Sequence, residues 1–272
     1  MKQLDVIYLY DGSYDGFFCA VYEAIYARQL PIDIVAKNDA QPTLYDLKTI
    51  LTDESKAARV MESICRKISP RASELVETVF LSCLSRKEIK ILRFLLLGYA
   101  TGARVCDMLG HEDVAALIKA EQHLLGEAHL LKGFVRFSDY GGILAATISP
   151  KNFVLPYIVP HFCERYNTER FMIYDKTHGH ALVYEHGKPQ ILKMDHVAFP
   201  NADEKELDYR ALWKQFYKTI SIEARENPRC RMTHMPKRYW GNMTEMQNEY
   251  PEVQKSDGGG GNLIISEKAL RT

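Results

Sequence analysis

The sequence predicts an α+β protein with an N-terminal strand-turn-helix and helical bundle, a small antiparallel β-β-α-β-β module and a long C-terminal helix. Apolar residues recur at helical spacing between residues 53 and 130, as expected for a bundle of about four helices. Short β-branched and aromatic runs separated by glycine-containing turns begin near residue 132. We therefore expect a strand and helical region over residues 1–131, a sheet module with the C-terminal helix and a basic segment over 132–253, and a flexible tail over 254–272.

Composition narrows the possible functions. The chain has 272 residues and equal numbers of acidic and basic side chains, 35 of each, so a general polyanion binder is excluded and any nucleic-acid surface must be local. No apolar run reaches the roughly 18 residues needed to span a bilayer, and the N-terminus is more typical of a strand than of a signal peptide. Six scattered cysteines without a C-x-x-C pair indicate a reducing, cytoplasmic protein. We expect neither a cofactor nor a membrane partner.

The N-terminal strand over residues 6–10 is followed by the turn D-G-S-Y-D-G and a helix over 17–28. Strand, glycine turn and helix is a geometry that binds phosphate, but two aspartates without a lysine would repel it. One interpretation is structural: Ser13 or Asp15 caps the helix, and the glycines permit the turn. The alternative is that Asp11 and Asp15 form a carboxylate pair at a site, where their proximity raises one pKa.

The helical block begins at Asp53, which is a plausible cap, and continues almost without interruption. Ser85 and Glu88 have the spacing of a capping box at the start of a later helix. A strand near residues 32–36 comes before the block. The expected helices cover residues 54–68, 70–84, 89–102 and 111–130.

The sheet module places Arg136 between two apolar residues of a strand, so Arg136 should face away from them, toward solvent or a ligand. His161, His178 and His180 lie in the same module, as does Asp175, but their spacing does not indicate a metal site. The expected strands cover residues 133–137, 142–148, 170–174 and 181–185, with a helix over 150–166 and a further short strand over 190–194.

The last long helix starts near Asp203 and carries one wide apolar stripe, which we expect to be buried in the core. It ends near Glu226, because Asn227 precedes a proline. The stripe consists of Tyr209, Leu212, Trp213, Phe216, Tyr217, Ile220 and Ala224.

A basic segment follows this helix, with five cations against one acid between residues 225 and 240. Pro228 and Pro236 predict that most of it is not helical. One interpretation is an interface whose cations contact phosphates while Tyr239 or Trp240 stacks on a base or ribose. The other is a solvated connection whose two aromatic residues pack onto the core. The cations are Arg225, Arg229, Arg231, Lys237 and Arg238.

Five motifs, taken together, resemble a bacterial family of putative DNA repair and DNA metabolism proteins. Members of that family are encoded beside a radical SAM protein similar to spore photoproduct lyase, and some are fused to a uracil-DNA glycosylase-type domain. The resemblance covers about residues 1–250 and includes no known catalytic mechanism. The motifs are Y-D-G-S-Y-D-G-F at residues 10–17, G-F-V-R-F at 133–137, L-P at 155–156, P-H-F at 160–162 and H-M-P-K-R-Y-W at 234–240.

The resemblance implies a role in DNA repair, together with a radical SAM protein encoded nearby. The first hypothesis is therefore a DNA-binding or lesion-presenting accessory of a radical SAM partner, using the basic segment with Arg136. The alternative is an enzyme acting on damaged bases or nucleotides, with Asp11 and Asp15, joined by His161 or Asp175, as acid–base groups. A third possibility is an assembly partner that contacts only the radical SAM protein.

Overall fold

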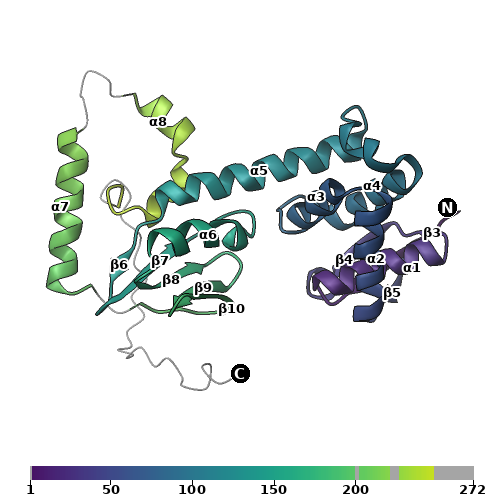
Figure 1. Cartoon of the computed structure of the whole chain (residues 1–272), viewed down its shortest axis with the longest axis horizontal. Coiled ribbons are helices and arrows are strands. Elements are labelled where there is room, and N and C mark those ends of the chain that lie inside the picture. The colour runs from purple at the N-terminus through teal and green to yellow at the C-terminus, as the bar shows by residue number, and fades with distance from the viewer. Residues whose placement is uncertain (1, 200–201, 221–226, 248–272) are drawn as a thin grey trace. The chain divides into compact units, whose positions relative to one another are not determined.

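A computed structural model describes residues 2–199, 202–220 and 227–247 of the chain (Figure 1). It contains two compact units, Met1–Leu125 and Gly126–Thr272, each described here by itself. The division falls inside helix α5 (Glu112–Phe134). The tail expected over residues 254–272 lies outside the described residues.

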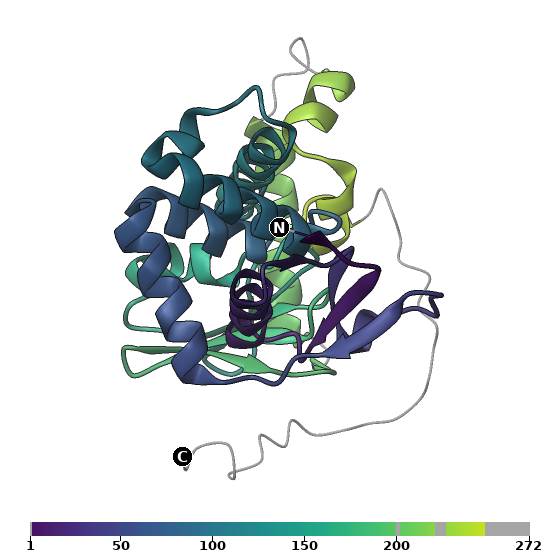
Figure 2. The ribbon, with the colours of Figure 1, turned by 90° about the vertical axis from the view of Figure 1, so that its right-hand side faces the viewer.

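The first unit contains a three-stranded parallel sheet that sequence reasoning did not predict. Its central strand β2 (Val6–Tyr10) pairs with β4 (Asp33–Ala36) on one side and β5 (Asp46–Thr49) on the other. Helix α1 (Tyr14–Tyr26) follows β2 and contacts it (Figure 2). The remaining short elements are β1 (Lys2–Gln3), β3 (Gln29–Leu30) and the 3₁₀ turn η1 (Lys37–Asp39).

Four further helical elements of the first unit follow the sheet, and α5 starts within the unit. Asp53 caps the first of them by accepting hydrogen bonds from the amides of Ser55 and Lys56 at 3.0 and 3.2 Å. The capping box expected at Ser85 is wrong, because Arg86 takes the cap position in a left-handed conformation and binds Asp33 at 2.7 Å. The elements are α2 (Glu54–Lys67), α3 (Pro70–Phe80), α4 (Lys87–Thr101) and the 3₁₀ helix η2 (Gly102–Asp107).

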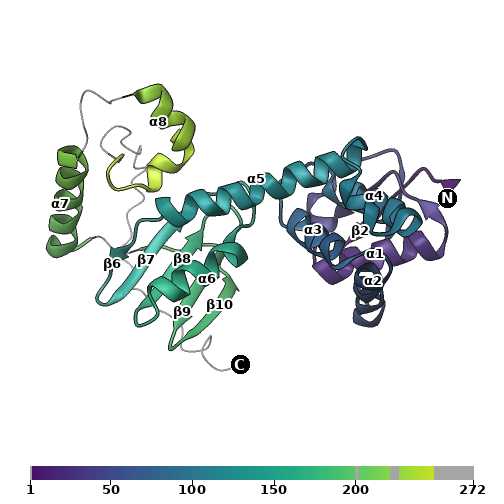
Figure 3. The same cartoon turned by 45° about the horizontal axis from the view of Figure 1, so that its top comes forward.

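The second unit is built on a five-stranded mixed sheet with the strand order β10-β9-β8-β7-β6. The expectation of a purely antiparallel sheet is wrong, because α6 (Leu155–Arg165) returns the chain so that β8 runs parallel to β7. Helix α6 contacts β9 and β10 (Figure 3). The strands are β6 (Ser138–Asp139), β7 (Ile143–Ile148), β8 (Arg170–Asp175), β9 (His180–Glu185) and β10 (Lys188–Lys193).

The strand expected over residues 133–137 is also wrong, because α5 continues to Phe134. Buried Leu124, Ala128 and Leu131 extend the helical spacing, and the Phe134 ring packs 5.5 Å from that of Tyr239. This packing outweighs the low helix propensity of glycine at position 133.

Helix α7 (Glu204–Ile220) does not bury its apolar stripe, contrary to expectation. Its polar side attaches it to β6: Glu206 accepts a hydrogen bond from the Asp139 amide at 3.1 Å, and Arg210 donates to the Ser138 hydroxyl at 2.6 Å. Ala224 and Glu226 lie outside the described residues. None of the described helices has the length and apolar character needed to cross a membrane.

Candidate nucleic-acid interface

The described part of the basic segment is largely helical, so the expectation of a non-helical ribbon is wrong. It forms α8 (Pro228–His234) and the 3₁₀ helix η4 (Lys237–Asn242). Pro228 occupies the first helical position, where no backbone donor is needed, and Asn227 caps the helix by accepting from the Cys230 amide at 3.0 Å. Pro236 separates the two helices.

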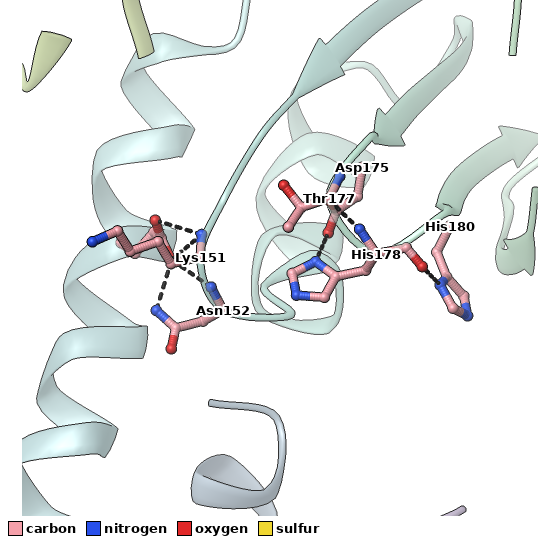
Figure 4. A network of polar contacts seen from close by, with 7 residues as sticks. Lys151, Asn152, Asp175, Thr177, His178 and His180 are labelled. Carbon is pink, nitrogen blue, oxygen red and sulfur yellow. Dashed lines mark hydrogen bonds and ion pairs between the residues drawn. The ribbon is translucent and has the colours of Figure 1, made fainter. Parts of the chain in front are cut away.

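A buried carboxylate, that of Glu127 on α5, holds the segment in place. Glu127 is only 2% exposed. It accepts from the backbone amides of Lys151 and Asn152 and from the Asn152 side chain, the last at 2.6 Å. Figure 4 shows the first two donors where the chain leaves β7. The Nη2 of Arg238 and the hydroxyl of Tyr239 complete the set, each at 2.9 Å. Burial opposes the charge on Glu127, but these donors outweigh it and lower its pKa.

The two aromatic residues of the segment are structural. Tyr239 is 2% exposed and Trp240 is 3% exposed. Burial, together with the nearby Glu127 carboxylate, raises the pKa of Tyr239 to about 12. The indole of Trp240 donates to the Met235 carbonyl at 2.9 Å. The stacking role expected for these rings is therefore not supported, and they pack onto the core instead.

Two of the predicted cations are paired with buried acids. Arg238 binds Glu127, and Arg136 binds Glu245 through two contacts of 2.6 and 3.1 Å. Arg136 was expected in a strand, facing solvent or a ligand, but it follows the end of α5 and lies outside any strand. Its side chain is 22% exposed, and its guanidinium lies 5.4 Å from the Trp213 ring. Burial opposes the charge on Glu245, but hydrogen bonds from Arg136 and Trp213 lower its pKa. Arg136 is thus neutralised inside the unit.

The residues of α8 and η4 have a local excess of positive formal charge. Residues 227–247 contain four cations, Arg229, Arg231, Lys237 and Arg238, and one acid, Glu245. Adding Arg136 and Glu127 gives five cations against two acids, a net charge of +3. Arg231 and Lys237 lie over the Trp240 ring at 5.2 and 5.8 Å, which holds their charges beside one another. We call Arg229, Arg231 and Lys237 the basic surface; Arg225 lies outside the described residues.

The carboxylates predicted near the N-terminus organise a turn. Asp11 accepts hydrogen bonds from the amide and hydroxyl of Ser13 at 2.9 and 2.6 Å, and from the Thr52 hydroxyl at 2.7 Å. These donors lower the pKa of Asp11, the opposite of the shift expected for a carboxylate pair. Asp15 lies in the first turn of α1, and Ser13 caps that helix. The structural interpretation of this motif is therefore the better one.

Asp175 and His178 form a hydrogen-bonded pair in the second unit. Sequence analysis placed both residues in the same module but did not predict their contact. Asp175 is fully buried at the end of β8, and its carboxylate accepts from the Thr177 and His178 amides. The Nδ1 of His178 lies 2.6 Å from Asp175 Oδ2 (Figure 4). His161 lies on α6, where burial and then Lys132 and Arg165 lower its pKa. No contact between His161 and Asp175 is found among the described residues.

Sequence reasoning missed the carboxylates that decide this arrangement. Glu127 continues the buried spacing of Leu124 and Leu131 on α5, so an acid inside an apolar stripe was the available signal. Glu245 carried no comparable signal. Within the described part of the chain, no group of three or more His, Cys, Asp or Glu residues is placed to hold a metal ion.

Comparison with known proteins gives one match. A family described as a domain of unknown function, DUF4130, matches residues 85–245, which include Glu127, Arg136, Arg238 and Glu245. No curated protein and no solved structure matches the chain. Because the match covers more than half of the sequence, the chain belongs to the DUF4130 family.

Proposed function

We propose that this protein is a cytoplasmic DNA-binding or lesion-presenting accessory in DNA repair, acting with a radical SAM partner. The observation that supports DNA binding is the concentration of four cations against one acid in residues 227–247, a formal net charge of +3 around α8 and η4. Clustered lysine and arginine side chains bind the phosphate backbone and release its counterions. The repair setting and the partner come from the resemblance of the sequence motifs to that family.

The burial of Tyr239 and Trp240 changes the expected mode of binding. Trp240 orients the cations Arg231 and Lys237, whereas Tyr239 holds Arg238 against Glu127. The proposal is therefore binding directed at phosphates, without base stacking and with little sequence preference. With about three phosphate contacts, log affinity should fall with log salt at a slope of about −2 on single strands and about −3 on duplex.

The test replaces two exposed cations of the basic surface. Arg229→Ala with Lys237→Ala should weaken binding of a labelled oligonucleotide at low salt and should reduce the salt slope by about 1.4 on a single strand and about 1.8 on duplex. The matched control, Lys188→Ala with Lys193→Ala, removes two exposed cations from β10 of the same unit and should leave affinity almost unchanged. Equal affinity of the Arg229/Lys237 variant and wild type would contradict DNA binding through the basic surface.

A second candidate function is an enzyme acting on damaged bases or nucleotides. The observation that favours it is the Asp175–His178 pair, because a buried carboxylate on one ring nitrogen fixes the tautomer and orientation of a general base. These residues replace Asp11, whose hydrogen bonds organise a turn, and Asp15, which lies in the first turn of α1. His178→Gln should then abolish turnover of a damaged oligonucleotide with binding retained. If the wild-type protein modifies no member of a panel of damaged oligonucleotides, the enzyme hypothesis is wrong.

A further inference from the structure

Helices α1 and α2 of the first unit carry a second group of aromatic and basic side chains. Tyr22 and Tyr26 lie one turn apart on α1, and their rings stack with centroids 5.8 Å apart and planes at 8° to each other. Helix α2 packs against α1 (Figure 3) and places Lys56 and Arg59 over the Tyr22 ring, at 5.7 and 5.8 Å from its centroid. We call these four residues the tyrosine surface.

The two rings of the tyrosine surface differ in burial. Tyr22 is half-buried and packs against the core of the first unit, which fixes its position. Tyr26 is 77% exposed, so most of its ring is open to a partner. The tyrosine surface therefore presents an accessible ring whose orientation is held by its stacking on Tyr22.

The Trp240 ring of the basic segment provides a comparison. Two cations, Arg231 and Lys237, also lie over this ring, but Trp240 is buried and cannot stack on a base. The tyrosine surface combines the same pairing of two cations and a ring with the exposed ring of Tyr26. It therefore has the accessible aromatic face that the basic surface lacks.

The cations of the tyrosine surface are available to an anionic partner. Helix α2 contains four cations and two acids, a net charge of +2. Arg59 is exposed, and within the described part of the chain it forms no ion pair. Lys56 lies 3.9 Å from Asp53, but both side chains are exposed, so this ion pair is weak. On α1, the carboxylate of Glu23 is already bound by Lys48 at 2.7 Å.

An exposed ring beside two cations matches the chemistry of a nucleic-acid strand with an unpaired base. Every base has a face that stacks on an aromatic side chain, and the adjoining phosphates bind lysine and arginine. In a duplex these base faces are covered by neighbouring base pairs, so the base must be single-stranded or extruded. An acidic protein segment would match the cations but would leave the Tyr26 ring unused.

We propose that the tyrosine surface binds single-stranded DNA, with one base stacked on Tyr26 and the adjacent phosphates bound by Lys56 and Arg59. This inference rests on the proposed DNA binding and adds base stacking to it, at a surface that belongs to the first unit. Stacking of this kind tolerates any base, so it adds affinity for unpaired nucleotides without a sequence preference.

Fluorescence anisotropy of the full chain with two labelled strands tests the proposal: oligothymidine and an abasic strand of the same length. Wild type should bind oligothymidine at least about fivefold more tightly, the lower end of what stacking of one base contributes. Tyr26→Ala should remove this difference and leave affinity for the abasic strand unchanged, whereas Tyr26→Phe should retain it. Arg59→Ala should weaken binding of both strands and reduce the salt slope by about 0.7.

Tyr45→Ala is the matched control. Tyr45 is another exposed tyrosine of the first unit, and within the described part of the chain its ring has no stacked ring and no cation over it. This variant should keep the wild-type preference for oligothymidine. Circular dichroism should confirm that all variants are folded.

Equal affinity of wild type for the two strands would overturn the proposal, as would equal losses in Tyr26→Ala and Tyr45→Ala. An effect of Arg59→Ala without any effect of Tyr26→Ala would show a surface for phosphate or for an acidic protein, and would also overturn base stacking.

The Arg229/Lys237 variant separates this test from that of the basic surface, because it should weaken both strands alike and preserve the preference for oligothymidine. If this variant loses affinity while Tyr26→Ala behaves as wild type, the tyrosine surface alone is wrong. If it binds as wild type while Tyr26→Ala loses the preference, the basic surface alone is wrong. A wild type that binds neither strand would overturn both proposals.

Discussion

The substitution Glu127→Gln tests whether one buried carboxylate holds the basic segment to the second unit. Glutamine has the shape of glutamate, but it replaces one accepting oxygen with an amide group that can only donate. Glu127 Oε2 accepts from the backbone and side chain of Asn152, whereas Oε1 accepts from Arg238 and Tyr239. The amide nitrogen will therefore take the Oε1 position, because the Tyr239 hydroxyl can turn to accept from it.

The expected change in the free energy of unfolding follows from the interactions that Glu127→Gln removes. The charge-assisted hydrogen bond from Arg238 is removed, at about 1.5–3 kcal/mol. The other donors lose the ionised acceptor that holds them. The Arg238 side chain is 32% exposed and recovers some hydration, which limits the cost. We expect the free energy of unfolding of the second unit to fall by about 2–4 kcal/mol, a large part of the stability of a typical domain.

Urea unfolding, monitored by tryptophan fluorescence, measures this loss of stability in the second unit. The chain has 2 tryptophans, Trp213 and Trp240, and both belong to the second unit. Glu164→Gln, an exposed substitution on α6 of the same unit, is the control and should change stability by no more than about 0.5 kcal/mol. A loss below about 1 kcal/mol for Glu127→Gln would refute the reasoning, because the network would then contribute little to holding the segment.

Three more predictions concern the two buried carboxylates and two glycines. The pKa values of Glu127 and Glu245 are lowered in the folded state, so their contribution to stability is present above the ordinary value of 4.5 and is lost as the pH falls through the folded values. Fluorescence-monitored unfolding should show this acid loss in wild type and a shallower loss in Glu127→Gln. Gly16→Ala should destabilise the first unit by about 1–3 kcal/mol in thermal circular dichroism, because its Cβ would lie 2.2 Å from Asp11 Oδ1. Gly126→Ala, in a helix with nothing near the new Cβ, should instead stabilise the chain by up to about 1 kcal/mol.

Local signals in the sequence predicted the α+β class and many individual elements. The Asp53 cap and the Ser13 cap follow from side chains that bind amides two or three residues away, so short stretches contain the information. The parallel pairing of β7 with β8 depends on where α6 returns the chain. Pairing of this kind is non-local and leaves no local signature.

The candidate site was harder to predict, because charge and aromatic content do not specify which partners a side chain meets. Arg136 and Arg238 are cations in a basic context, yet carboxylates 109 and 111 residues away in sequence bind them. Periodicity likewise identified the apolar side of α7 but not its environment. A 3–4 repeat indicates that a face favours burial, but it does not specify what buries that face.

The Glu127 network also has a consequence for synthesis of the chain. Tyr239 lies 112 residues after Glu127, so at about 5–20 residues per second the ribosome needs roughly 6–22 s to add it. Lys151 and Asn152 emerge much earlier and can engage the carboxylate first. Closure by Arg238 and Tyr239 is therefore among the last steps of assembly, and a nascent chain arrested before them keeps a water-exposed acid where the finished protein has a sealed one.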